Sequence, residues 1–189
     1  MKYSIMDFYE DVGTLTSERA QLFRDTFMKN HADKSGGHSY ELVYAALFQD
    51  LASVKNVCEL GIYHGASLRA WRELFPNANI VGLDRDSNYF VNEERITSYY
   101  ADQEKEETLT IPGNIKFDMF VDDASHNFEF TLKTFEKLNK FVNGYYVIED
   151  IKDYDLDKWQ KLNYPNSWLV DMSSLRPNLH DNHVLVIKL

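Results

Sequence analysis

The stretch that decides the fold reads "CELGIYHGASLRAWRELFPNANIVGLD" and runs from Cys58 to Asp84. It opens with a short apolar strand that stops at Gly61, and it continues into "ASLRAWRELF", whose apolar residues recur at helical spacing. Pro76 and Asn77 end that helix, and "NIVGLD" follows as a second strand. A strand, a helix and a strand in this order predict a right-handed crossover between two parallel strands.

The same alternation continues along the rest of the chain. Further strands are predicted at 95–102, 117–123, 144–150, 167–172 and 183–189, and helices at 128–142 and 155–162. The last two strands are linked by the polar segment "SSLRPNLHDN", which is too broken to form a crossover helix. We therefore expect seven strands, mostly parallel and covered on both faces by helices, with an antiparallel hairpin at the edge.

The first third of the chain has a helical pattern instead. Helices are predicted at 17–30 and 39–52, on either side of the polar loop "HADKSGGHS". The apolar face expected for the first helix consists of Leu22, Phe23, Phe27 and Met28. We interpret 1–189 as a single domain in which 1–54 is a helical extension and 55–189 is the α/β core.

Composition narrows the classes of function. The chain has 189 residues and a formal net charge of −10, and this acidity disfavours a nucleic-acid partner. Its single cysteine, Cys58, has no internal partner for a disulfide, as is typical of a reducing compartment. The N-terminus lacks the apolar core of a signal peptide, and no apolar run is long enough to span a bilayer. The sequence therefore predicts a cytoplasmic protein without a membrane partner.

A candidate cofactor site follows the first predicted strand. In open α/β sheets, ligands bind at the carboxyl ends of the strands. Gly61 and Gly65 let the backbone pass close beneath a ligand, but Tyr63 occupies the second glycine position of the dinucleotide fingerprint. Glu59, before this turn, suits S-adenosylmethionine, whose methionine end carries an amino group and no phosphate. Asp84 is placed to hydrogen-bond a ribose of either a dinucleotide or S-adenosylmethionine.

A candidate catalytic site follows two later strands. Asp123 ends one of them and Glu149 and Asp150 end the next, so three carboxylates meet if the strands are neighbours. A hard divalent cation such as Mg²⁺ would relieve their repulsion, orient a hydroxyl and lower its pKa, and His126 could then accept the proton. The alternative is that these are ordinary strand-end acids and helix caps and that His126 is a surface residue.

Five blocks of the sequence, taken in order, resemble one family. They are "HADKSGGHSY" (31–40), the stretch 58–84, "ADQEKEETL" (101–109), "FDMFVDDASH" (117–126) and "NGYYVIEDI" (143–151). In this respect the chain resembles the class I S-adenosylmethionine-dependent O-methyltransferases, and among them the metal-dependent group that methylates mycinamicin and other macrolide sugars. The resemblance implies the Rossmann-like class I methyltransferase sheet; a nucleotide-binding domain of dehydrogenase type is the alternative.

The resemblance also implies roles for individual residues. The cofactor would be bound by Glu59, Gly61, Tyr63, Gly65, Asp84, Asp102, Gln103 and Asp122. The metal ligands would be Asp123, Glu149 and Asp150, with His126 as the catalytic general base. Ala124 stands where the family has glycine, so a turn that needs a positive φ would be strained there.

The predicted activity is therefore a divalent-metal-assisted O-methylation that uses S-adenosylmethionine and Mg²⁺, or another hard cation. The partner expected is a small-molecule acceptor, a sugar hydroxyl or a similar small polyol, and a homo-oligomer fits the family. Two alternatives keep the fold: a catalytically degenerate S-adenosylmethionine-binding or assembly module, and a metal-independent small-molecule methyltransferase. Nucleic-acid methylation is disfavoured by the charge of −10.

Overall fold

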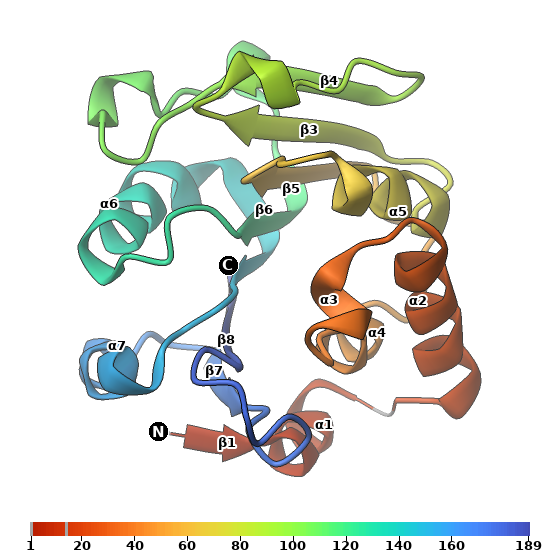
Figure 1. Ribbon diagram of the computed structural model, residues 1–189, viewed down its shortest axis with the longest axis vertical. Helices are drawn as coiled ribbons and strands as arrows, with labels where there is room; N and C mark the ends of the chain where they lie inside the picture. The colour runs from red at the N-terminus through yellow and green to blue at the C-terminus, as the bar shows by residue number, and fades with distance from the viewer. Residues whose placement is uncertain (1, 14) are drawn as a thin grey trace.

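A computed structural model describes residues 2–13 and 15–189 and shows an eight-stranded sheet with helices on both faces (Figure 1). The strands are β1 (Lys2–Ser4), β2 (Asn56–Leu60), β3 (Asn79–Asp84), β4 (Ile96–Tyr100), β5 (Phe117–Asp122), β6 (Val142–Ile148), β7 (Ser167–Asp171) and β8 (His183–Lys188). The helices are α1 (Ile5–Val12), α2 (Ser17–Lys29), α3 (Asp33–Gly36), α4 (Glu41–Leu47), α5 (Ala66–Leu74), α6 (Phe128–Leu138) and α7 (Leu156–Leu162). Short 3-10 turns lie at Ser87–Tyr89, Glu106–Thr108, Pro112–Asn114, Asn139–Phe141 and Asp153–Asp155.

The strand order explains why the predicted site residues share one edge of the sheet. The order is β1-β7-β8-β6-β5-β2-β3-β4, and the five strands from β6 to β4 are mutually parallel. Leu60 pairs with Asp122 on one side and with Leu83 on the other, and Asp122 pairs with Ile148. The residues that follow β2, β5 and β6 therefore emerge side by side at the carboxyl edge.

The sheet differs from the prediction in one strand. Seven strands were expected, but Lys2–Ser4 adds an eighth by pairing in parallel with β7. Three residues are too few to give a periodic signal in the sequence. The predicted antiparallel hairpin is present, with Asp171 opposite His183, but β8 lies between β6 and β7, and β1 forms the outer edge.

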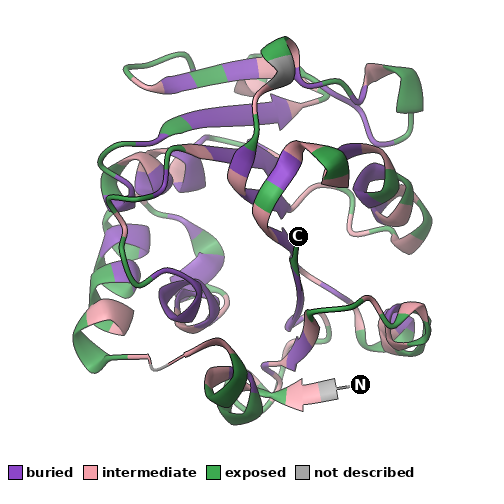
Figure 2. Ribbon diagram, turned by 180° about the vertical axis from the view of Figure 1, so that it is seen from behind, coloured by how far each residue is buried: buried purple, intermediate pink, exposed green. Residues whose placement is uncertain are grey.

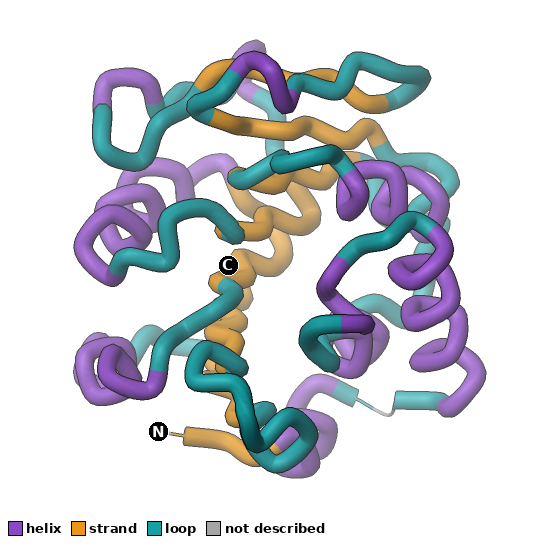
Figure 3. The backbone as a smooth tube through the Cα atoms, in the orientation of Figure 1, coloured by secondary structure: helices purple, strands orange, loops and turns teal. Residues whose placement is uncertain are grey.

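The helices divide between the two faces of the sheet, as Figures 1 and 3 show. On one face, α1, α2, α4 and α5 pack over a cluster that includes Phe23, Phe27 and Trp71. On the other face, α6 and α7 pack over a cluster that includes Phe135 and Trp159. The buried residues form bands on the inward sides of both layers (Figure 2). In the described part of the chain, no helix is both long and apolar enough to span a membrane.

Helix α2 buries a narrower face than the sequence predicted. Phe23 and Phe27 are fully buried together with Thr26, but Leu22 and Met28 are 47% and 52% exposed. Their inclusion in the buried face was wrong. A helix packed against one layer buries only the positions that recur at i and i+3 or i+4, and Leu22 and Met28 lie outside that stripe.

Candidate active site

The turn after β2 is shaped by its first glycine. Gly61 has a φ of 101°, and a Cβ built on it would lie 2.0 Å from the carbonyl oxygen of Asp123. Only glycine therefore lets this turn pass so closely over the end of β5. The carboxylate of Asp84, at the end of β3, accepts the Ile62 N–H at 2.8 Å and fixes the turn from the other side.

A pocket of about 520 Å³ opens in front of this turn. Among its lining residues are five that the sequence assigned to the cofactor: Gly61, Tyr63, Asp84, Asp102 and Gln103. They follow β2, β3 and β4, so the edge of the sheet brings together side chains that are distant in sequence. Asp123, assigned to the metal, also lines this pocket.

Three other residues assigned to the cofactor lie behind the pocket wall. Glu59 is fully buried, and its carboxylate lies 2.7 Å from Trp71 Nε1 and 3.0 Å from Lys34 Nζ. Gly65 opens α5 with a φ of 72°, and a Cβ there would lie 2.4 Å from Val91. Each of these residues holds the shape of the cofactor turn from within.

The third such residue is Asp122, which is 2% exposed. Burial raises the pKa of its carboxyl group to about 7, against the opposing effect of hydrogen bonds from Gln103 and Tyr146. Gln103 Nε2 donates to its two oxygens at 2.8 and 2.9 Å, and Gln103 Oε1 accepts from the Ser125 hydroxyl at 2.6 Å. Asp122 therefore positions Gln103 on the pocket wall.

A cluster of two acids and a histidine adjoins the pocket. His126 Nε2 lies 3.1 Å from Asp123 Oδ1, and His126 Nδ1 lies 3.6 Å from Asp150 Oδ2. One donor atom from each of Asp123, His126 and Asp150 lies within 4.8 Å of the others. We call these three residues the acid–histidine cluster.

The backbone conformation of this cluster is unusual. His126 and Asp150 have φ values of 51° and 52°, in the left-handed region that non-glycine residues rarely adopt. Such conformations occur most often at functional sites. Ala124 is not among the described residues with a positive φ, so the strain expected at this departure from the family pattern does not arise.

Glu149, the third acid assigned to the metal, faces a different set of partners. It is 2% exposed, its Oε2 lies 2.5 Å from Lys34 Nζ, and the Tyr44 hydroxyl donates to its Oε1. The structure therefore brings Asp123 and Asp150 together around His126, while Glu149 points toward α3 and α4.

Lys34 is a site residue that the sequence analysis missed. Its side chain is 1% exposed, and its ammonium contacts Asp123 at 2.9 Å, Glu59 at 3.0 Å and Glu149 at 2.5 Å. Burial acts to lower the pKa of Lys34, but the three carboxylates outweigh it and raise the pKa well above its usual value. A lysine in a polar loop is normally exposed. The one available signal was its place in "HADKSGGHSY", a block that resembles the family.

The same loop and α4 cover the cluster. The Tyr40 hydroxyl donates to Asp150 Oδ1 at 2.7 Å, and His38 Nε2 lies 3.6 Å from that oxygen. The His38 ring stacks on Tyr40 with centroids 4.5 Å apart. His38 therefore lies beside the acid–histidine cluster.

The charges of the cluster shift its ionisation. Burial opposes protonation of His126, but Asp123 and Asp150 outweigh it and raise the pKa of the imidazole. Burial, followed by the nearby Asp123 charge, raises the pKa of Asp150. Burial would also raise the pKa of Asp123, but Lys34 and His126 hold it below its usual value. Asp123 and Asp150 together thus favour a positive charge on the His126 imidazole.

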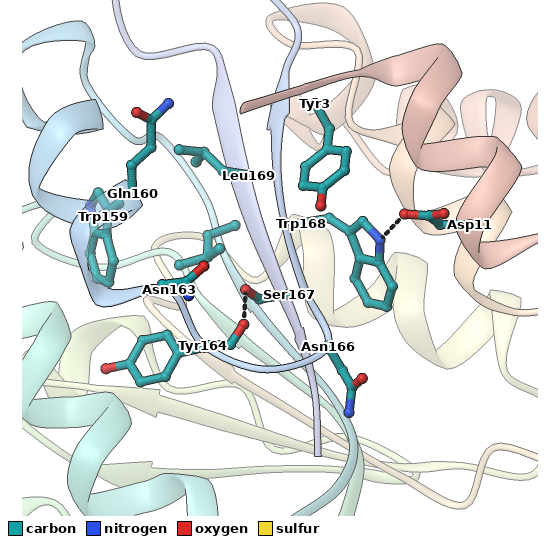
Figure 4. A pocket seen from close by; sticks show the side chains of 11 residues that line it. Tyr3, Asp11, Trp159, Gln160, Asn163, Tyr164, Asn166, Ser167, Trp168 and Leu169 are labelled. Carbon is teal, nitrogen blue, oxygen red and sulfur yellow. Dashed lines mark hydrogen bonds between the residues drawn. The ribbon is translucent and has the colours of Figure 1, made fainter. Parts of the chain in front are cut away.

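A second pocket, of about 300 Å³, lies beside the outer strands β1 and β7 (Figure 4). Its walls come from α7, β1 and the start of β7, and they carry aromatic rings and amides, including Trp159, Asn163 and Trp168. Among the described residues that line it, Asp11 is the one acid, and it accepts from Trp168 Nε1 at 2.8 Å. This pocket contains none of the residues predicted to be functional.

No family model matches the chain. It is 36% identical over 106 residues to the demethylmacrocin O-methyltransferase of Streptomyces fradiae, a match that takes in 50% of this chain and 27% of that protein. It is 32% identical over 126 residues to the mycinamicin VI 2''-O-methyltransferase of Micromonospora griseorubida, covering 60% of this chain and 32% of that protein.

A solved structure decides the fold. The MycE methyltransferase of mycinamycin biosynthesis, in complex with Mg and SAH, superposes with a TM-score of 0.65 over 88% of this chain, at 24% identity. The fold is that of a Rossmann-like methyltransferase. The predicted resemblance to class I S-adenosylmethionine-dependent O-methyltransferases is confirmed in sequence and in fold. The matched part of this chain covers 54% of the MycE chain and less than a third of the two sequence relatives.

Proposed function

We propose that the protein is an S-adenosylmethionine-dependent O-methyltransferase, assisted by a divalent metal ion, that acts on a sugar hydroxyl or a similar small polyol. The observation that carries this proposal is that the pocket in front of the Gly61 turn and the acid–histidine cluster share Asp123. A methyl donor in the one and a hydroxyl in the other would then be neighbours, and proximity of two reactants supplies much of the acceleration of such a reaction.

The residues proposed to hold the cofactor are those of the 520 Å³ pocket. Asp84 would accept hydrogen bonds from the ribose hydroxyls, and Asp102 and Gln103 would lie against the adenine. Glu59 and Asp122 remain assigned to the same site. Glu59 would act by holding the shape of the Gly61 turn, and Asp122 would act by positioning Gln103.

The donor set of the acid–histidine cluster suits a divalent cation. Donor atoms that share one Mg²⁺ at about 2.1 Å lie at most about 4.2 Å apart, and here one oxygen of Asp123 and one oxygen of Asp150 lie within 4.8 Å of each other. Asp123 and Asp150 would hold the ion, with Glu149 as the third acid proposed. When bound, the ion orients the acceptor hydroxyl, lowers its pKa and neutralises the two aspartates that raise the pKa of His126.

His126 is proposed as the general base. Its ring is 27% exposed and contacts Asp123, which lines the pocket. The proton of the acceptor hydroxyl would pass to the imidazole, the oxygen would form a bond to the methyl carbon, and the sulfur–carbon bond of the cofactor would break. Tyr40 and His38 would help to orient Asp150.

The relatives support the class of acceptor. Their names describe methylation of demethylmacrocin and of the 2'' oxygen of mycinamicin VI. A sugar or glycoside is therefore the acceptor proposed here, and a homo-oligomer remains a prediction.

A metal-independent methyltransferase is the second candidate, and Lys34 favours it. The ammonium already neutralises Asp123 and Glu149, so these carboxylates have a counter-ion within the chain itself. In that reaction His126 and its two aspartate partners would remove the proton alone.

The decisive experiment measures methyl transfer from S-adenosylmethionine to a panel of nucleotide sugars and glycosides, with and without a chelator. We expect turnover that chelation abolishes and Mg²⁺ restores, and that falls at least about a hundredfold in Asp123→Asn and His126→Ala. Asp157→Asn, an exposed carboxylate on α7, is the matched control. Turnover that survives chelation would leave the metal-independent reaction, and failure to bind S-adenosylmethionine would exclude both.

A further inference from the structure

The ammonium of Lys34 stands where three strand ends converge. Of its three carboxylate partners, Glu59 lies one residue before the end of β2, and Asp123 and Glu149 directly follow β5 and β6. All three contacts are 3.0 Å or shorter. The side chain reaches them from α3, a short helix outside the sheet. Because Lys34 is 1% exposed, its charge is balanced by protein groups and not by water.

We propose that Lys34 is a built-in competitor for the divalent cation. The inference rests on the metal site proposed above. The ammonium occupies Asp123 Oδ2 and Glu149 Oε2, and both carboxylates belong to the set from which a metal ion would draw its ligands. Binding of the ion therefore requires the ammonium to withdraw from these two oxygens.

Electrostatics make the two cations alternatives. A divalent ion on Asp123 would lie a few ångströms from the Lys34 ammonium, and like charges at that separation repel strongly in a buried site. Both oxygens of the Asp123 carboxylate already have a basic neighbour, since Oδ1 lies 3.1 Å from His126 Nε2 and Oδ2 lies 2.9 Å from Lys34 Nζ.

Glu59 gives the withdrawn ammonium a place to remain. Of the three carboxylates that contact Lys34, Glu59 is the one that is not proposed as a metal ligand. Its Oε1 contacts Lys34, and its Oε2 accepts a hydrogen bond from Trp71 Nε1 at 2.7 Å. The ammonium can thus keep a buried counter-ion while it releases Asp123 and Glu149. Tyr44, which donates to Glu149, holds that side chain in place during the exchange.

The first test is the affinity for Mn²⁺ or Mg²⁺, measured by titration calorimetry. Lys34→Met removes the competitor, and we expect at least about tenfold tighter binding together with a lower melting temperature of the metal-free protein. Saturating metal should close most of that difference in melting temperature. Lys29→Met is the matched control, because Lys29 forms an exposed ion pair with Glu73 at 2.7 Å. It should change neither the affinity for the metal ion nor the melting temperature of the metal-free protein.

The second test uses the unaltered protein, and it decides the matter if Lys34→Met does not fold. Lys34 is the one lysine with a buried side chain in the part of the chain whose side chains are described, so its ammonium protons should exchange slowly enough for ¹⁵N-lysine NMR. We expect this signal to shift on titration with Mg²⁺. An unchanged signal under conditions where the ion binds would overturn the proposal and leave the metal site intact.

The remaining outcomes separate the two proposals. If Lys34→Met binds the ion and the unaltered protein does not, competition by Lys34 is supported and excludes the metal from the native site. If neither binds it, the metal site and the competitor role both fall. If both bind it equally, only the role of Lys34 falls.

Discussion

At the scale of single residues, Gly61 and Gly113 differ in how much space surrounds a side chain added at each position. Gly61→Ala should destabilise the protein by about 3 kcal/mol or more, because the added Cβ would meet the Asp123 carbonyl oxygen at 2.0 Å in a backbone with a φ of 101°. Gly113→Ala is the control: its φ is 75°, but a Cβ there meets nothing within 4 Å. It should cost about 1 kcal/mol. Urea unfolding measures both, and equal losses would contradict the close approach of the turn to β5.

A second prediction at this scale concerns pH and Asp122. Its pKa is raised by burial from 3.8 to about 7, so between these values the folded state holds a proton that the unfolded state has lost. Stability contributed by the protonated carboxyl is therefore lost as the pH rises from about 4 to about 7. Asp122→Asn removes that loss, so the variant should gain stability relative to the native protein across this range.

The measurement is the difference in the free energy of unfolding between the two proteins, taken from pH 4 to pH 8. It should rise up to about pH 7 and then level off. Asp157→Asn, an exposed position on α7, should give a flat difference. A flat difference for Asp122→Asn would mean that the carboxyl group is ionised throughout.

At the scale of elements, α6 depends on its N-cap. Asn127 Oδ1 accepts the backbone N–H groups of Glu129 at 3.0 Å and Phe130 at 3.3 Å. Asn127→Ala leaves these donors without that acceptor and should cost about 1 kcal/mol in thermal unfolding. Lys133→Ala, on the exposed face of the same helix, should be close to neutral. A neutral Asn127→Ala would indicate that other groups satisfy the helix start.

The elements also show what the sequence could predict. The parallel strands were recognisable because each is a short apolar run that ends in a glycine or an acid, as at Gly61, Asp84 and Asp123. The carboxyl-edge location of the site followed from that pattern. Strand β1 was not recognisable, since its three residues gain their pairing only from β7, far along the chain.

Side-chain direction was less predictable than strand position. Glu149 and Asp150 are adjacent in sequence, yet the first contacts Lys34 and the second faces His126. The φ of 52° at Asp150 turns the chain at that point, and no residue type in "VIEDI" signals it. Lys34 was missed for a related reason: its three partners lie at the ends of three different strands.

At the scale of the whole molecule, we expect the N-terminal helices and the sheet to unfold together. Trp71 on α5 contacts Phe27 of α2 and Tyr44 of α4, with ring centroids 5.0 and 4.7 Å apart, and also donates to Glu59. Contacts this close between the helical layer and the sheet favour one cooperative transition.

The measurement compares far-ultraviolet circular dichroism with tryptophan fluorescence during urea unfolding. Replacement of Trp159 and Trp168 by phenylalanine leaves Trp71 as the one tryptophan, so fluorescence excited selectively at tryptophan reports on this interface. Coincident transitions are expected. A fluorescence change that precedes the loss of ellipticity would show that α2 and α4 detach before the sheet unfolds.

The position of β8 governs the order in which the molecule can assemble on the ribosome. Although β8 follows β7 in the chain, it lies between β6 and β7 and pairs with both. Neither β7 nor β1 can therefore join the sheet until 183–188 has left the exit tunnel. Strand β1 pairs with β7, so it can join only after β8 has brought β7 into the sheet. The region around β1 and β7 should be the last part of this sheet to gain protection from proteases during synthesis, long after the strands β2 to β5 that flank the Gly61 turn.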